Sequence, residues 1–177
     1  MSEPVRQIIA LGGGGFFRNP DDLRLERYLL AQTGRARPRV CMLATASGDA
    51  SGYPGAWHHA FARLETDHIH LSLFTPHTSD FAGLLLAQYL IYVGGGNTHS
   101  LLALWREWGV DAILRQAWQQ GIVLAGSSAG SICWFEQGVT DSTHGALTPL
   151  PCLGFLPGSN CPHYDSEPDR RPTYRRL

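Results

Sequence analysis

The chain has 177 residues, 44% of them hydrophobic, and its 14 arginines, with no lysine, against 15 aspartates and glutamates give a formal net charge of -1. This length and hydrophobic content suffice for one sizeable core, so we expect a single domain over residues 1–177. The near-neutral charge gives no electrostatic footprint for nucleic acid or for an anionic membrane, and we expect neither as a partner.

The cysteines and the chain's apolar segments bear on its compartment. Four cysteines, Cys41, Cys133, Cys152 and Cys161, lack the spacing of metal ligands. Apolar neighbours around Cys41 and Cys133 favour reduced, buried thiols. No segment approaches the roughly 20 apolar residues of a membrane helix, and the apolar part of residues 1–11 is too short for a signal peptide. We therefore expect a cytoplasmic protein.

Short apolar runs bounded by Gly, Pro or Ser alternate along the chain with longer segments of helical period. This alternation predicts parallel strands joined by crossover helices. Strands are expected at residues 5–11, 39–45, 68–74, 89–93 and 122–125, and helices at 21–33, 55–65, 79–87, 98–108, 111–119 and 131–136. Alternating polarity in 68–74 favours a strand near the sheet edge, whereas the apolar 89–93 should be covered on both faces. We expect a doubly wound α/β fold with a mostly parallel sheet and helices on both faces.

Ser128 is the centre of a GxSxG pattern, Gly126 to Gly130. The pattern alone is weak, but here it joins a buried strand to a helix, which is the setting of a nucleophile held in a tight turn. Such a turn aims the serine oxygen at the helix N-terminus, where free N–H groups favour developing negative charge. Ser128 is therefore the candidate nucleophile, ahead of Ser127 and Ser131, which do not occupy the centre of the turn.

The glycine run Gly94 to Gly96 also follows a buried strand, so it should lie at the same carboxyl edge of the sheet as the serine. It lacks the spacing of a dinucleotide fingerprint and the ending of a P-loop. One N–H group of this run, from Gly95 or Gly96, is expected to form an oxyanion hole with that of Ala129. A tight turn without a ligand is the alternative. Gly12 to Gly15 is expected only to line the cleft.

Eight histidines compete for the role of general base. We favour His163, because the segment Cys161 to Asp165 is nonhelical and carries an acid two residues after the histidine. On an extended backbone, residues i and i+2 point the same way, so Asp165 could orient the imidazole. The others are expected to be surface or core residues, or have no evident partner: His58, His59, His68, His70, His77, His99 and His144.

Four separated segments together resemble one family. They are VGGGNT (93–98), GSSAG (126–130), VTDS (139–142) and PHYD (162–165). Their order and spacing are similar to those of the peptidase E group, the aspartyl dipeptidases related to cyanophycinase. The motifs that carry the resemblance lie in the second half of the chain. The first half resembles the family in its alternation of strands and helices.

The resemblance implies a fold like that of the class I glutamine amidotransferases. It also implies Ser128 as nucleophile, His163 as base, and an oxyanion hole from Gly95, Gly96 and Ala129. The activity it implies is hydrolysis of dipeptides with an N-terminal aspartate, without a metal or organic cofactor. A monomer and a homodimer are both compatible with it.

The third member of the triad has more than one candidate. Asp165 matches the acid two residues after the histidine in the amidotransferase relatives, and we prefer it. Asp141 is the alternative, at the place where longer peptidase E sequences carry an aspartate, and Glu136 is a third candidate. The chain ends soon after His163, and the segment between Ser128 and His163 is short. We therefore expect that C-terminal elements usual in the family, and part of its specificity pocket, are lacking.

We expect a serine peptidase-like hydrolase that acts on small peptides through an acyl-enzyme. Arg170 or Arg171 could attract an acidic substrate group, although both could equally be surface charges. A glutaminase-like reaction is the first rival, but it uses cysteine where Ser128 stands, and Cys133 lies too far along the chain to replace it. The second rival is a binding module that holds a small ligand or a partner without turnover.

Overall fold

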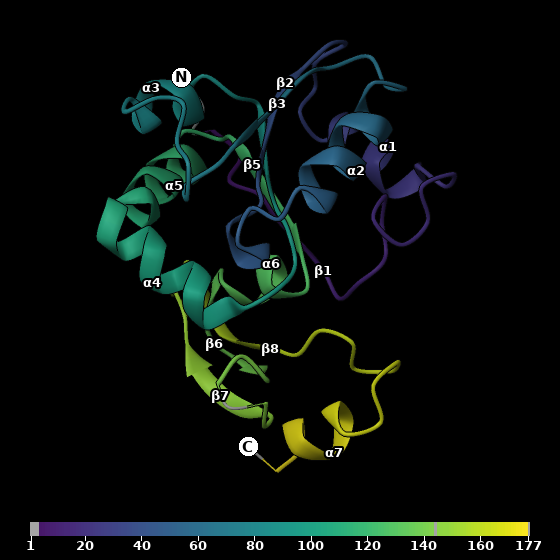
Figure 1. Cartoon of the computed structure of the whole chain (residues 1–177), viewed down its shortest axis with the longest axis vertical. Helices are drawn as coiled ribbons and strands as arrows, with labels where there is room; N and C mark the ends of the chain where they lie inside the picture. The colour runs from purple at the N-terminus through teal and green to yellow at the C-terminus, as the bar shows by residue number, and fades with distance from the viewer. Residues whose placement is uncertain (1–3, 144, 177) are drawn as a thin grey trace.

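The computed structural model describes residues 4–143 and 145–176. Within these residues, five parallel strands form the main sheet in the order β1-β5-β4-β2-β3 (Figure 1). The strands are β1 (Ile8–Leu11), β2 (Arg39–Leu43), β3 (Asp67–Leu71), β4 (Leu90–Val93) and β5 (Val123–Ser127). Because all five strands run parallel, their carboxyl ends lie along one edge of the sheet.

Helices cover both faces of this sheet, which confirms the predicted doubly wound fold (Figure 1). The helices on one face are α1 (Arg24–Ala31) and α2 (Gly52–Phe61), and those on the other are α3 (Phe81–Leu86), α4 (Thr98–Trp108) and α5 (Val110–Gln119). Successive residues of the central strand β4 divide between the two cores. Tyr92 packs in the same cluster as Trp57 of α2, and Val93 packs in the same cluster as Leu101 of α4.

β3 lies at the edge of the sheet, as the alternation in residues 68–74 predicts. Its His70 faces α2, where Nε2 of His58 lies 2.8 Å from Nδ1 of His70. The chain turns away after Leu71 because the carboxylate of Asp49 accepts hydrogen bonds from the Ser72 hydroxyl and from the backbone N–H of Leu73. The histidines of this edge are therefore packed among themselves and away from the carboxyl end of β5.

The expected helix at residues 131–136 is wrong beyond Ile132. Helix α6 covers only Ala129–Ile132, and strand β6 (Phe135–Thr140) follows almost at once. The carbonyl of Trp134 accepts hydrogen bonds from the N–H groups of Phe155 and Leu156, 2.8 and 2.9 Å away. These distant partners replace the i+4 N–H groups that a longer helix would need.

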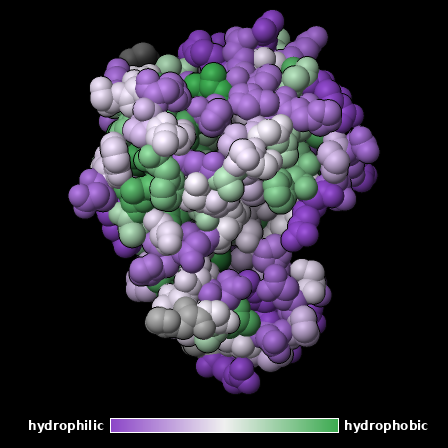
Figure 2. Space-filling view, viewed as in Figure 1, coloured by the Kyte–Doolittle hydropathy of each residue, from purple (hydrophilic) through white to green (hydrophobic). Residues whose placement is uncertain are grey.

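In the described residues, β6 is the centre of a second, three-stranded sheet of order β7-β6-β8. β7 (Thr148–Pro151) pairs with it antiparallel and β8 (Leu156–Asn160) pairs parallel. The last helix, α7 (Arg170–Tyr174), lies beside this sheet at the lower end of Figure 1. In Figure 2 the molecule narrows between the large upper part and this smaller part, and the surface mixes hydrophilic and hydrophobic residues.

No helix of residues 4–143 and 145–176 combines the length and the apolar content needed to cross a membrane. The longest helix, α4, has 11 residues, whereas a span takes roughly 20.

Candidate active site

Ser128 sits at a sharp turn between β5 and α6, with φ 56° and ψ -114°. A positive φ is uncommon for a residue with a side chain and marks local strain. The flanking glycines allow this turn to pack against the sheet. A β-carbon on Gly126 would lie 2.2 Å from the carbonyl oxygen of Gly130, and one on Gly130 would lie 2.2 Å from that of Val93. Each glycine of the GxSxG pattern therefore stands where a side chain would collide with a neighbouring backbone segment.

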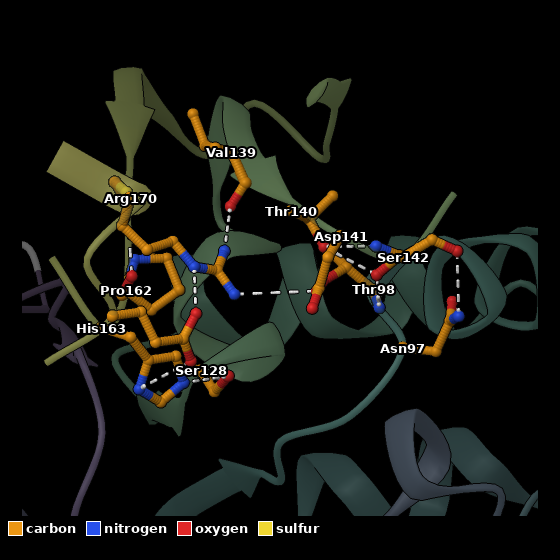
Figure 3. Close-up of polar contacts among 12 residues, drawn as sticks. Asn97, Thr98, Ser128, Val139, Thr140, Asp141, Ser142, Pro162, His163 and Arg170 are labelled. Carbon is orange, nitrogen blue, oxygen red and sulfur yellow. Dashed lines mark hydrogen bonds and ion pairs between the residues drawn. The ribbon is translucent and has the colours of Figure 1, made fainter. Parts of the chain in front are cut away.

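His163 faces this serine, and its Nε2 lies 2.9 Å from Oγ of Ser128 (Figure 3). The segment that carries His163 is held by the loop after β1. The N–H of His163 donates to the carbonyl of Gly12 at 2.9 Å, and a β-carbon on Gly13 would lie 3.1 Å from Nδ1 and Cε1 of the imidazole. The loop of Gly12 and Gly13 thus positions the imidazole as well as lining the cleft. The geometry suits transfer of the serine proton to the imidazole.

The extended backbone expected around His163 is wrong. His163 has φ 56°, and its carbonyl accepts hydrogen bonds from the N–H groups of Ser166 and Glu167, at 3.1 and 2.9 Å. This turn carries Asp165 away from the ring: its side chain is 80% exposed and pairs with Arg171. The turn brings Glu167 back instead, with Oε1 4.0 Å from Nδ1 of His163.

A buried arginine joins this carboxylate to β6. The side chain of Arg170 is only 5% exposed; its Nε donates to Glu167 at 2.7 Å and its Nη1 donates to the carbonyl of Val139 at 3.0 Å (Figure 3). Nη2 of Arg170 lies 3.7 Å from Asp141. Asp141, the alternative acid, therefore contacts this arginine and not His163. Because Arg170 is buried, it is not the surface charge that was one of its two expected roles.

Of the expected oxyanion donors, Gly95 is already engaged, because its N–H donates to the hydroxyl of Tyr53 at 2.9 Å. The N–H groups of Gly96 and Ala129 have no acceptor within residues 4–143 and 145–176. These two groups remain available for a ligand oxygen beside Ser128. Tyr53 was missed by the sequence analysis, since no local pattern links the first turn of α2 with the loop after β4.

The end of β6 anchors the start of α4, which follows the glycine loop. The hydroxyl of Ser142 accepts from the N–H of Thr98 at 2.8 Å, and its carbonyl accepts from Nδ2 of Asn97 at 3.1 Å (Figure 3). Asn97 also caps α4, accepting from the N–H of Ser100 at 2.8 Å. The segments VGGGNT and VTDS are therefore in direct contact, although about 40 residues separate them.

A cavity of about 320 Å³ opens over Ser128 and His163, with Tyr53 and Gly96 in its wall. It adjoins a wider cavity of about 640 Å³ that Glu167 helps to line. Arg18 lies in the wall of both, and no other lysine or arginine of the described residues does. The arrangement places a serine hydroxyl, an imidazole and one guanidinium around cavities of the size that small ligands occupy.

The remaining candidates lie elsewhere. Glu136 lies on β6 and accepts from the N–H of Gly158 at 2.8 Å. Burial raises the pKa of the Cys133 thiol well above its usual range, so it is unsuited to nucleophilic attack. In the described part of the chain no other histidine hydrogen-bonds to Ser128, and no group of histidines, cysteines or acids could hold a metal ion. His144 lies outside the described residues.

The chain is similar to known proteins in sequence and in fold. The model of peptidase family S51 matches residues 8–177. A Bacillus subtilis (strain 168) protein described as "Uncharacterized peptidase YgaJ" is 57% identical over 173 residues, which cover 98% of this chain and 75% of that protein.

Two solved structures share the fold. One belongs to a Listeria monocytogenes EGD-e protein assigned as a peptidase E, with a TM-score of 0.65 and 25% identity, over 83% of this chain and 79% of that one. The other is a peptidase from an acI-B1 Actinobacterium, with a TM-score of 0.62 and 20% identity, over 84% of this chain and 64% of that one. The second likeness bears on the fold alone.

Proposed function

The chain belongs to peptidase family S51, and from this premise we propose that it is a serine-type peptidase that cleaves small peptides through an acyl-enzyme. The observation that carries the proposal is the 2.9 Å distance between Oγ of Ser128 and Nε2 of His163 at a strained strand-to-helix turn. A serine hydroxyl is a weak nucleophile until a base in hydrogen-bond contact removes its proton.

In the reaction, Nε2 of His163 takes the proton of Ser128 as Oγ bonds to the carbonyl carbon of the substrate. The N–H groups of Gly96 and Ala129 receive the carbonyl oxygen as it becomes negative. The C–N bond then breaks, and the amine leaves with the proton held by His163. Water attacks the acyl-enzyme and gives one proton to His163, which returns it to Ser128 as the second product leaves as a carboxylic acid. That acid then loses its own proton to solvent.

Glu167 is the acid of this scheme. When His163 holds the serine proton it carries a positive charge, and the carboxylate 4.0 Å from Nδ1 stabilises that charge. The hydrogen bond from Nε of the buried Arg170 fixes the orientation of this carboxylate. Glu167 replaces Asp165 and Asp141 in this role because neither of them contacts the imidazole.

For the substrate we propose dipeptides with an N-terminal aspartate, as the family resemblance implies. Support comes from Arg18, which lines both cavities. Arg170 is occupied by Glu167, and Arg171 is paired with Asp165. An aspartate side chain entering the site would meet the guanidinium of Arg18, which can bind a carboxylate through two parallel hydrogen bonds.

The alternative is that the same site hydrolyses another amide or holds a small ligand without turnover. Either of these functions would use the same fold and cavity, but neither requires a preference for substrates with an N-terminal aspartate. A glutaminase-like reaction has little support, because Ser128 occupies the turn and the thiol of Cys133 is buried.

We also propose a cytoplasmic location. The four cysteines are free. Burial raises the pKa of Cys41 to about 12, which keeps that thiol protonated and unreactive at neutral pH. Free thiols of this kind suit a reducing compartment.

The decisive experiment treats the protein with a fluorophosphonate probe and locates the label by mass spectrometry. We expect labelling of Ser128 and none in Ser128→Ala. A panel of dipeptides then tests specificity, with Asp-X substrates compared with Asn-X substrates of the same shape. Absence of label on Ser128 would overturn the peptidase proposal, whereas labelling with equal turnover of Asp-X and Asn-X would overturn only the acidic specificity.

A further inference from the structure

Tyr53 projects from the first turn of α2 into the cavity that contains Ser128 and His163. Two aromatic side chains from the loop after β1 fix its ring. Phe17 stacks on it with ring centroids 4.3 Å apart and planes 8° apart, and Phe16 meets it edge-on at 6.1 Å. These two contacts restrict the ring to one orientation and so limit where its hydroxyl can lie.

The Tyr53 hydroxyl and Ser128 both lie close to Gly95, towards the same side of its backbone. A β-carbon on Gly95 would be 3.2 Å from Cβ of Ser128 and 3.5 Å from Oη of Tyr53. The hydroxyl accepts the N–H of Gly95 at 2.9 Å. Its own proton has no acceptor among residues 4–143 and 145–176, so it remains free to bind a group in the cavity.

We propose that the Tyr53 hydroxyl is a catalytic donor of the oxyanion hole, acting beside Gly96 and Ala129 in the place expected for the Gly95 N–H. This inference rests on the proposed peptidase function and adds a residue to it. No proton is transferred in this role: the O–H remains intact, and its hydrogen bond strengthens as the substrate carbonyl oxygen becomes negative.

The environment of Tyr53 favours this role in two ways. Accepting a hydrogen bond from Gly95 polarises the hydroxyl and makes it a better donor, since bonds in a chain reinforce one another. Burial raises the pKa of Tyr53 above its usual value, so the hydroxyl keeps its proton at neutral and moderately alkaline pH.

The test is Tyr53→Phe, which removes the hydroxyl and keeps the ring between Phe16 and Phe17. We expect kcat to fall about tenfold to a hundredfold with KM changed less than about threefold, because the lost bond forms mainly in the transition state. The rate of fluorophosphonate labelling of Ser128 should fall by a similar factor, since phosphonylation also develops negative charge on an oxygen in this hole. This second readout does not depend on the peptide substrate.

Tyr28→Phe is the control for the loss of a tyrosine hydroxyl. Tyr28 lies on α1, its side chain is exposed, and it lines neither cavity. Its loss of a hydroxyl should leave the labelling rate within about twofold of the wild type. Melting temperatures of both variants identify any effect of altered packing, and labelling is compared below the lower of the two.

A third variant separates a donor from a merely structural group. 3-Fluorotyrosine at position 53 keeps the hydroxyl and lowers its pKa moderately, so we expect labelling near the wild-type rate at neutral pH and a loss at a lower alkaline pH than in the wild type, as the proton departs. Unchanged labelling in Tyr53→Phe, or the wild-type pH profile with 3-fluorotyrosine, would overturn the inference alone. Absence of labelling in the wild type would overturn the peptidase proposal and this inference together.

Discussion

Oε1 of Glu167 lies 4.0 Å from Nδ1 of His163, while Oε2 of the same carboxylate accepts a hydrogen bond from the buried Arg170. One carboxylate therefore lies beside the imidazole of His163 on one side and is hydrogen-bonded to a buried guanidinium on the other. The contact arises because the chain turns at His163, which brings residue i+4 rather than i+2 back to the imidazole.

Glu167→Gln should lower kcat by about tenfold or more, because a neutral amide does not stabilise the charged imidazole. KM should change little. Asp165→Asn is the matched control, since its carboxylate is exposed and pairs with Arg171, and its kcat should stay within about twofold of the wild type. Steady-state kinetics on the best dipeptide of the panel measures both. The reverse ranking of the two variants would restore Asp165 as the acid.

Arg170→Leu should lower the free energy of unfolding by about 3 kcal/mol, near the low end for breaking a buried ion pair, because Glu167 and Asp141 are themselves half exposed. Its loss also leaves the carbonyl of Val139 without its donor. Arg171→Leu, which removes an exposed ion pair, should cost less than about 1 kcal/mol. Urea denaturation measures both values. Equal losses would show that burial of Arg170 is not what stabilises the segment.

Gly13→Ala should slow fluorophosphonate labelling of Ser128 by about tenfold, with little change in melting temperature. The added methyl group would lie 3.1 Å from two atoms of the His163 ring, which has to shift away from the serine. Gly55→Ala is the control, because no atom lies within 4 Å of a β-carbon there. If both variants label at the wild-type rate, the loop after β1 does not position the base.

Arg18→Gln should raise KM for Asp-X dipeptides by about tenfold to a hundredfold, the value of one hydrogen bond to a charged group. KM for Asn-X dipeptides should stay nearly constant, because no ion pair is lost with them. Arg27→Gln removes an exposed positive charge from α1 and serves as the control for overall charge. A uniform rise in KM across both substrate series would assign Arg18 a role in the shape of the site and not in recognition of acid.

Acidification should destabilise the protein through the histidines of β3. Burial first, and then the neighbouring His58, lower the pKa of His68 and His70 below the usual value of 6.5. The unfolded chain therefore binds more protons than the folded chain near this pH, so stability is present above about pH 6.5 and is lost as the pH falls below it. Urea titrations at pH 7.5 and 5.5 measure the change. His70→Gln should reduce the difference, and an unchanged difference would place its origin in other groups.

Much of the fold can be predicted from the sequence, because each parallel strand is a short apolar run and each crossover helix carries one apolar face. Ser128 could be singled out because the GxSxG pattern joins a buried strand to a helix. His163 is favoured by a local argument that the structure does not bear out, since its backbone is not extended and Asp165 turns away from its ring. The second sheet could not be predicted, because β7 and β8 are rich in proline and glycine and exist by pairing with β6.

The contacts of Glu167 and Tyr53 depend on tertiary structure in the same way. Glu167 reaches the imidazole only because His163 adopts a positive φ, which nothing in the CPHYD segment indicates. Tyr53 reaches Gly95 across 42 residues of sequence. Local patterns thus locate a nucleophile, while its supporting residues emerge from the packing of separate elements.

The docking of residues 161–170 onto Gly12 and β6 also sets the order in which the active site matures. The strained turn of Ser128, the glycine loop and Tyr53 all leave the ribosome before His163 and Glu167 do. Until that segment has been made and packs against β6, Ser128 lacks the imidazole that lies 2.9 Å from its Oγ in the folded chain. Under the proposed mechanism, hydrolytic activity therefore reports that residues 161–170 have docked onto the rest of the domain.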